Sequence, residues 1–142
     1  RSINADMISR LIDRAIEGMS YAYTPYSGFR VGAALLTESG EIYTGCNIEN
    51  AAYTPTNCAE RTAFFKAVSE GERHFAAICI VGGKDGKLAD YTSPCGVCRQ
   101  VMMEFCEPEQ FKIILAISRE EYRIYTLKEL LPEGFGPARL AR

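Results

Sequence analysis

The chain has 142 residues, a length typical of one compact domain, and we expect a single domain over residues 1–142. Hydrophobic residues make up 47% and charged residues 24% of it, which is typical of globular proteins and excludes a disordered or collagen-like chain. Since no apolar run approaches the roughly 18 residues of a membrane-spanning helix, we expect no insertion into a membrane.

Basic and acidic residues nearly balance, at 16 and 18, for a net charge of −2. The Lys and Arg side chains are scattered, whereas proteins that bind a phosphate backbone usually carry a basic stripe. We therefore expect no nucleic acid polymer as partner. Residues 1–4 contain no apolar segment typical of a signal peptide, and we expect a cytoplasmic protein.

The first predicted element is an amphipathic helix over residues 5–19, where apolar side chains recur every three or four positions. Residues 29–37 and 41–46 are predicted strands. The link over residues 38–40 is long enough only for a hairpin, so this pair is expected to be antiparallel. An irregular loop follows over residues 47–57, and loops of this length in compact domains are often functional.

A second helix is predicted over residues 58–70, ended by Gly71, followed by a buried apolar strand over residues 76–81. This second helix carries a stripe of small residues that allows close packing on a sheet. The stripe consists of Ala59, Ala63 and Ala67.

A third helix is predicted over residues 94–106 and a further strand over residues 112–117. Because a helix separates this strand from the preceding one, the two should be parallel. The last strand, residues 122–126, follows a link of four residues, which permits only an antiparallel hairpin, and a short helix over residues 127–131 completes the pattern. The expected fold is an α/β three-layer α-β-α sandwich around a mixed five-stranded sheet whose last strand is antiparallel.

The chain contains six cysteines, which in a cytosolic protein more often bind metal or do redox chemistry than form disulfides. Three of them, Cys46, Cys79 and Cys106, are expected to be thiols of the hydrophobic core. The other three, Cys58, Cys95 and Cys98, lie at the starts of the second and third predicted helices.

The two helix starts are expected to meet at one end of the sheet. Helix N-termini carry partial positive charge and free N–H groups, which lower thiol pKa values and stabilise thiolates. Arg61, in the first turn of the second helix, adds a full positive charge. Cys58, Cys95 and Cys98 are therefore candidate zinc ligands.

Three protein ligands leave one tetrahedral position for water, which is typical of catalytic zinc. Glu60 lies two residues after Cys58 and is a candidate general acid and base. The Pro-Cys-x-x-Cys segment on its own also fits a redox pair or half of a four-ligand structural site, and a zinc-stapled binding module would need a fourth ligand. His74, the only histidine, is expected to be exposed and without a catalytic role.

Five segments together resemble the cytidine deaminases, specifically the small, homotetrameric, three-cysteine type. The resemblance covers nearly the whole chain and includes the Cys-x-Glu and Pro-Cys-x-x-Cys pattern of zinc deaminases. The segments are FRVGAAL (29–35), CNIENA (46–51), CAERTA (58–63), SPCGVCRQ (93–100) and ELLP (129–132).

The resemblance implies one Zn²⁺ per subunit, held by the three cysteines, with Glu60 as the proton shuttle and Arg61 offsetting thiolate charge. It also implies a homotetramer with sites at subunit interfaces. The implied substrate contacts are Asn47 and Glu49 to the ribose, Phe29 to the pyrimidine, the Ala59 N–H group to the base carbonyl, and Phe135, Tyr53 and Tyr26 in a neighbouring subunit's site.

The activity implied is hydrolytic deamination of cytidine and 2′-deoxycytidine to uridine and 2′-deoxyuridine with release of ammonia, a step of pyrimidine salvage. The alternative is a zinc deaminase of another aminopyrimidine nucleoside or a nucleoside antibiotic. A polynucleotide deaminase is disfavoured, because that related branch joins its last strands through a helix and the four-residue link at 118–121 is too short for one.

Overall fold

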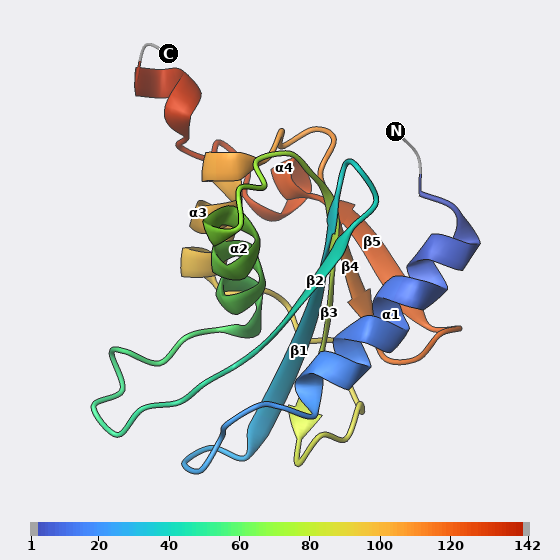
Figure 1. Ribbon diagram of the computed structural model, residues 1–142, viewed down its shortest axis with the longest axis vertical. Coiled ribbons are helices and arrows are strands. Elements are labelled where there is room, and N and C mark those ends of the chain that lie inside the picture. Colours follow the sequence, from blue (N-terminus) through green and yellow to red (C-terminus); the bar gives the residue numbers. More distant parts are fainter. Residues whose placement is uncertain (1–2, 141–142) are drawn as a thin grey trace.

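The computed structural model describes residues 3–140 and consists of one five-stranded sheet with helices on both faces (Figure 1). The strand order is β2-β1-β3-β4-β5. The strands are β1 (Phe29–Thr37), β2 (Ile42–Cys46), β3 (Phe75–Lys84), β4 (Lys112–Ala116) and β5 (Tyr122–Thr126). The helices are α1 (Ala5–Met19), α2 (Ala59–Ser69), α3 (Gly96–Phe105) and α4 (Leu127–Leu130), and a 3₁₀ turn follows at Pro137–Leu140.

Strand directions confirm the predicted topology. β1 is antiparallel to both β2 and β3, β3 is parallel to β4, and β5 returns antiparallel to β4. β3 extends beyond the predicted 76–81, because Gly82, Gly83 and Lys84 still pair with the start of β1. Since β3 and β4 are parallel, their carboxyl ends lie at the same end of the sheet.

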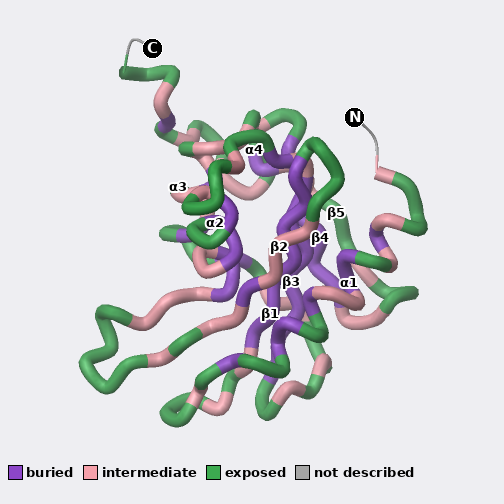
Figure 2. Tube along the Cα trace, viewed as in Figure 1, coloured by how far each residue is buried: buried purple, intermediate pink, exposed green. Residues whose placement is uncertain are grey.

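Side chains that alternate along the strands form two cores, one on each face of the sheet. Helix α1 covers one face, and α2 and α3 cover the other (Figure 1). Buried residues follow the central strands and the helix faces that meet them (Figure 2). Both faces of β3 are covered, which explains its almost unbroken apolar sequence.

The longest helix within residues 3–140 is α1, with 15 residues. A bilayer-spanning helix needs about 20 apolar residues. No helix in the described part of the chain has the length and apolar character to cross a membrane.

Close helix–sheet contacts depend on small residues on both surfaces. Ala59, Ala63 and Ala67 of α2 are fully buried, as their spacing predicted. Opposite them lies Gly45 of β2, where an added Cβ atom would lie 2.3 Å from the Ala59 carbonyl oxygen. On the other face an added Cβ atom at Gly32 would lie 2.1 Å from the Ala15 carbonyl oxygen of α1. These contacts set how closely α1 and α2 approach the sheet.

Replacing Gly32 by Ala should lower the free energy of unfolding by about 3 kcal/mol, because the new methyl group overlaps backbone that cannot rotate away. Urea unfolding of Gly32→Ala against the parent measures this. The control is Gly96→Ala, where no atom lies within 4 Å of the added Cβ position. Equal loss of stability in both variants would contradict the close-contact explanation.

Candidate active site

The N-termini of α2 and α3 meet at the end of the sheet where β3 and β4 finish (Figure 1). Cys58 is the N-cap residue of α2, and Cys95 is the N-cap residue of α3. Cys98 lies in the first turn of α3, and its backbone N–H donates to the Cys95 sulfur at 3.4 Å. The two helix starts therefore bring the three predicted ligands together.

The three sulfur atoms have the spacing of a single metal site. All three lie within 4.8 Å of one another, with Cys58 Sγ 3.8 Å from Cys95 Sγ and Cys95 Sγ 3.4 Å from Cys98 Sγ. Tetrahedral ligands with Zn–S bonds of about 2.3 Å are about 3.8 Å apart. Within residues 3–140 the cluster has three members. The donor set therefore fits a zinc ion with three protein ligands.

Positive charge lies directly against this cluster. The Arg61 guanidinium donates from Nη2 to Cys58 Sγ at 3.2 Å, and its buried Nε has no hydrogen-bond partner in the described chain. Hydrogen bonds from the Cys98 thiol and from Arg61 lower the pKa of Cys58 to about 5, against the opposing effect of burial. The pKa of Cys98 is raised, because Cys98 donates to Cys58 and is buried. The Arg61 guanidinium therefore lies where it can offset negative charge on the Cys58 sulfur.

Glu60 is one of two buried polar or charged residues among those described, with 4% of its surface exposed. The pKa of Glu60 is raised to about 7, chiefly by burial and also by the charge of Cys58, while the hydrogen bond from the Glu60 backbone N–H and the charge of Arg61 act in the opposite direction. A carboxyl group with a pKa near neutrality can both accept and return a proton. Its position two residues after Cys58 places this group beside the metal ligands.

The loop over residues 47–57 is closed at its base by two hydrogen bonds between Ile48 and Asn57, so that Asn47 and Glu49 come beside the start of α2. Asn47 also holds the start of β1: its Oδ1 accepts from the Val31 N–H at 2.9 Å, and its Nδ2 donates to the Phe29 carbonyl at 2.8 Å.

The turn before β1 wraps around the Glu49 carboxylate. Glu49 Oε1 accepts from the backbone N–H groups of Tyr26 and Ser27, at 3.0 and 3.2 Å, and Oε2 accepts from the Ser27 hydroxyl. The hydrogen bond from Ser27 is the first cause of the lowered pKa of Glu49. Glu49 is therefore held ionised, as an acceptor for hydroxyl groups.

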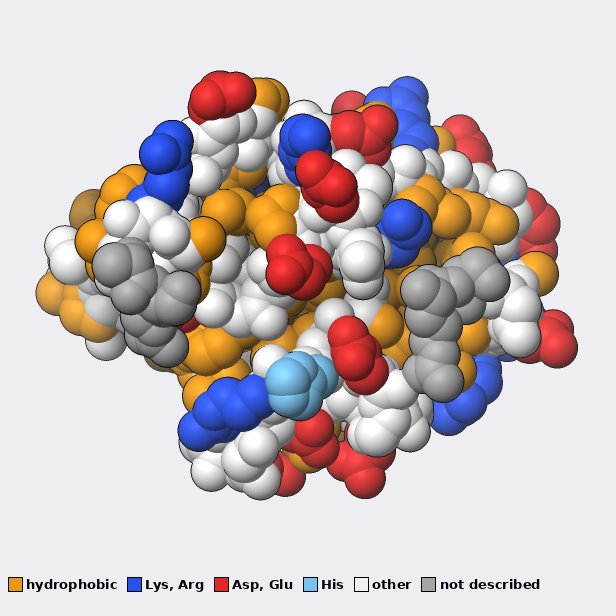
Figure 3. All heavy atoms as spheres, turned by 90° about the horizontal axis from the view of Figure 1, so that it is seen from above, with side chains coloured by type: hydrophobic (Ala, Val, Ile, Leu, Met, Phe, Trp, Pro, Cys, Tyr) orange, Lys and Arg blue, Asp and Glu red, His pale blue; other side chains and the backbone are white. Residues whose placement is uncertain are grey.

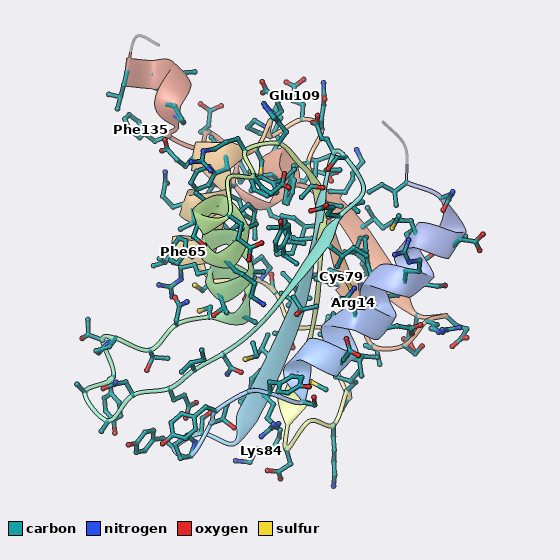
Figure 4. All side chains as sticks on the ribbon, viewed as in Figure 1. Arg14, Phe65, Cys79, Lys84, Glu109 and Phe135 are labelled. Atoms are coloured by element: carbon teal, nitrogen blue, oxygen red, sulfur yellow. The ribbon has the colours of Figure 1, made fainter. Side chains whose placement is uncertain are left out.

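The remaining predicted contact residues fall into two groups. The Ala59 side chain is fully buried and its backbone lies in the first turn of α2, at the metal cluster. Phe29 is 41% exposed at the start of β1, and Tyr53 is 74% exposed at the tip of the long loop, where its ring meets the Tyr26 ring edge-on at 6.3 Å. Phe135 lies on the segment after α4, at the opposite end of the molecule from Lys84 (Figure 4). The Phe135 carbonyl accepts a hydrogen bond from Gln100 Nε2 of α3 at 2.9 Å.

Of the residues that were given no chemical role, His74 lies away from this end, whereas Cys46 ends β2 directly before Asn47. His74 is exposed where β3 begins, at the opposite end of the sheet, and both acidic and basic side chains lie around it (Figure 3). A cavity of about 470 Å³ opens there, lined in part by Glu38, His74, Phe105 and Glu107, and it contains none of the three clustered cysteines. Cys79 is fully buried under α1, and Cys46 and Cys106 are partly buried.

Comparisons with known proteins agree with this geometry. Residues 6–114 match the family model described as the cytidine and deoxycytidylate deaminase zinc-binding region. The chain belongs to this deaminase family. A cytidine deaminase of Sporosarcina psychrophila is 49% identical over 128 residues, which are 90% of each chain. The crystal structure of a cytidine deaminase from Burkholderia pseudomallei has 44% identity and a TM-score of 0.81, covering 89% of this chain and 97% of that one. A crystal structure of cytidine deaminase from Mycobacterium tuberculosis has 36% identity and a TM-score of 0.78, covering 95% of this chain and 99% of that one.

Three supporting residues of this deaminase site were not found from the sequence. Ser27 donates to Glu49, Lys84 donates to the Ser27 carbonyl at 2.6 Å, and Arg99 holds the turn before Cys95. The contact partners of Ser27 and Lys84 lie 22 and 57 positions away, so no local pattern predicts them. Arg99 had a weak signal, since it follows the metal ligand Cys98 directly.

Purified protein should contain one zinc ion per chain, and Cys58→Ala should contain almost none, because two remaining thiolates cannot hold the ion tightly. Metal analysis after gel filtration measures the content. Cys79→Ala is the matched control, since it removes a fully buried thiol on the other face of the sheet. Zinc at the parent level in Cys58→Ala would contradict the assigned ligand set.

Proposed function

We propose that this chain is a cytidine deaminase that hydrolyses cytidine and 2′-deoxycytidine to uridine and 2′-deoxyuridine, releasing ammonia, in pyrimidine salvage. It is then a hydrolase of a cyclic amidine C–N bond. The observation that carries this proposal is the cluster of three sulfurs at metal spacing with the buried Glu60 beside it. The 49% identity to a cytidine deaminase over 90% of the chain supports the same substrate class.

Cys58, Cys95 and Cys98 would hold one Zn²⁺ ion per subunit, in agreement with the zinc-binding family and the sulfur spacing. When bound, zinc supplies the Lewis acidity that makes water nucleophilic at neutral pH. Arg61 and the two helix N-termini offset the negative charge of the three thiolates.

Glu60 moves the protons of the reaction. It accepts a proton from the attacking water and delivers it to N3 of the pyrimidine while the water oxygen bonds to C4. Glu60 then takes the proton of the new C4 hydroxyl group and delivers it to the amino group, so that the C4=O double bond forms as the C4–N4 bond breaks and ammonia leaves. The pKa of about 7 suits both directions of transfer.

Residues near the starts of β1 and α2 would orient the substrate. Asn47 and Glu49 would bind the ribose hydroxyl, Phe29 would pack on the base, and the Ala59 N–H group would donate to the base carbonyl. Glu49 is pre-set for this role, because Tyr26 and Ser27 hold its carboxylate ionised and immobile. Asn47 has one amide N–H beyond the bond to Phe29, which leaves it a donor for a hydroxyl.

The working form would be a homotetramer of chains with one catalytic domain each, located in the cytoplasm. A cluster of exposed aromatic side chains supports association, since such surfaces are usually covered in oligomers. The cluster comprises Tyr21, Tyr23, Tyr26, Phe29 and Tyr53, and Phe135 is exposed separately on the segment after α4. Phe135 and Tyr53 would then complete the site of a neighbouring subunit.

Glu60→Gln should lower kcat for cytidine by at least about 100-fold while the protein keeps its zinc, because general acid–base transfer is lost and no metal ligand is changed. The fall in absorbance as cytidine becomes uridine measures turnover, and metal analysis measures zinc. Glu104→Gln, an exposed change on α3, is the control. Near-parental turnover in Glu60→Gln would exclude the shuttle role, and an inactive parent on a nucleoside panel would exclude the proposed activity.

Phe135→Ala and Glu60→Gln should complement each other when their subunits are mixed and reassembled. If Phe135 acts on a neighbour's site, a mixed tetramer contains sites with an intact Glu60 and an intact Phe135 from different chains. Activity above that of either variant alone is therefore expected. Each variant reassembled with itself is the control, and no recovery in the mixture would place Phe135 outside the neighbour's site.

A further inference from the structure

Arg99 makes three side-chain hydrogen bonds to three different residues. Its Nε donates to the Pro94 carbonyl at 2.8 Å, and its Nη2 donates to the Ser93 hydroxyl at 2.8 Å. Its Nη1 donates to the Leu130 carbonyl at the end of α4, at 2.5 Å. One planar guanidinium group therefore joins the turn before α3 to the C-terminal part of the chain.

The turn that Arg99 holds carries the least protected metal ligand. Cys58 is partly buried and Cys98 is 1% exposed, but Cys95 is exposed. Cys95 also follows the irregular segment 85–94, which connects the end of β3 to α3. In the described chain, the hydrogen bonds that join Ser93 and Pro94 to other residues come from Arg99.

We propose that Arg99 is a positioning residue for the metal centre, which fixes the turn carrying Cys95 against the end of α4. The proposal rests on the proposed zinc site and adds a residue outside the ligand set to it. The Arg99 backbone N–H also donates to the Cys95 carbonyl at 3.0 Å, so the same residue holds residues 93–95 through both backbone and side chain.

The neighbouring residue extends this connection along the C-terminal segment. Gln100 Nε2 donates to the Phe135 carbonyl at 2.9 Å, five residues after the Leu130 carbonyl that Arg99 binds. Two consecutive residues of α3, directly after the ligand Cys98, therefore hold the C-terminal segment at two points. Residues 93–95, which carry the ligand Cys95, and the segment that carries Phe135 are therefore both bound to the first turns of α3.

Arg99→Lys tests the proposal, since a lysine keeps the positive charge but cannot reach three acceptors in one plane. Zinc-loaded protein is mixed with a chromogenic zinc chelator and the rate of zinc transfer is recorded. We expect the variant to lose zinc on the order of tenfold faster than the parent, as is usual when a residue that orients metal ligands is changed. Transfer at the parental rate would overturn the proposal, and a parent without zinc would instead overturn the proposed function.

Arg119→Lys is the matched control, because Arg119 also uses Nε and Nη2 in a fork, to Asp13 on the opposite face of the sheet. It should release zinc at the parental rate.

Unfolding temperatures separate a metal-positioning role from a general stabilising one. Zinc stabilises the folded chain according to its affinity, so the difference in Tm between zinc-loaded and zinc-free protein should shrink in Arg99→Lys. An equal fall of both temperatures, with the difference unchanged, would assign Arg99 to general stability and overturn the proposal.

If Arg99→Lys does not fold, the chelator assay on Ser93→Ala decides. This change removes one exposed acceptor of Arg99, and Ser118→Ala removes a hydroxyl that accepts hydrogen bonds in the distant β4–β5 turn. Faster zinc loss in Ser93→Ala than in Ser118→Ala supports the proposal, and equal rates overturn it.

Discussion

Two helix N-termini that converge on three sulfur atoms are the arrangement on which the rest of the site depends. Thiolates in close contact repel one another, so their assembly needs positive charge and N–H donors from several directions. The starts of α2 and α3 and the Arg61 guanidinium provide these. The strands β2, β3 and β4 run in the same direction, so the helices that connect them, α2 and α3, lie on one face with their starts at the same end of the sheet.

Close packing on both faces of the sheet gives this arrangement a rigid base. Helix α1 contacts β1 at Gly32, and α2 contacts β2 at Gly45. At both points the backbone of the helix lies directly against the backbone of the strand. A helix held this closely has little freedom to slide or tilt. The position of Cys58 at the start of α2 is therefore set by the packing of the Ala stripe one turn and more away.

Much of the fold and of the metal site could be predicted from the sequence, because both depend on local patterns. The four-residue link at 118–121 determined the direction of β5, and the cysteine spacing placed the ligands at two helix starts, as observed. The contacts of Ser27 with Glu49 and of Arg99 with Leu130 could not be predicted, because they join segments 22 and 31 residues apart. The role expected for Phe135 depends on a neighbouring chain, so it follows from the resemblance and from no pattern within one chain.

The double use of Asn47 and Glu49 limits how this deaminase can evolve. The same amide and carboxylate that would bind the sugar also complete the backbone hydrogen bonds where β1 begins. A mutation of these residues that adapts the pocket to a different sugar would therefore also remove hydrogen bonds that hold the start of β1. Changes in substrate preference should accumulate instead on side chains without a structural role, such as the exposed ring of Tyr53. Asn47 and Glu49 should remain nearly invariant as relatives diverge.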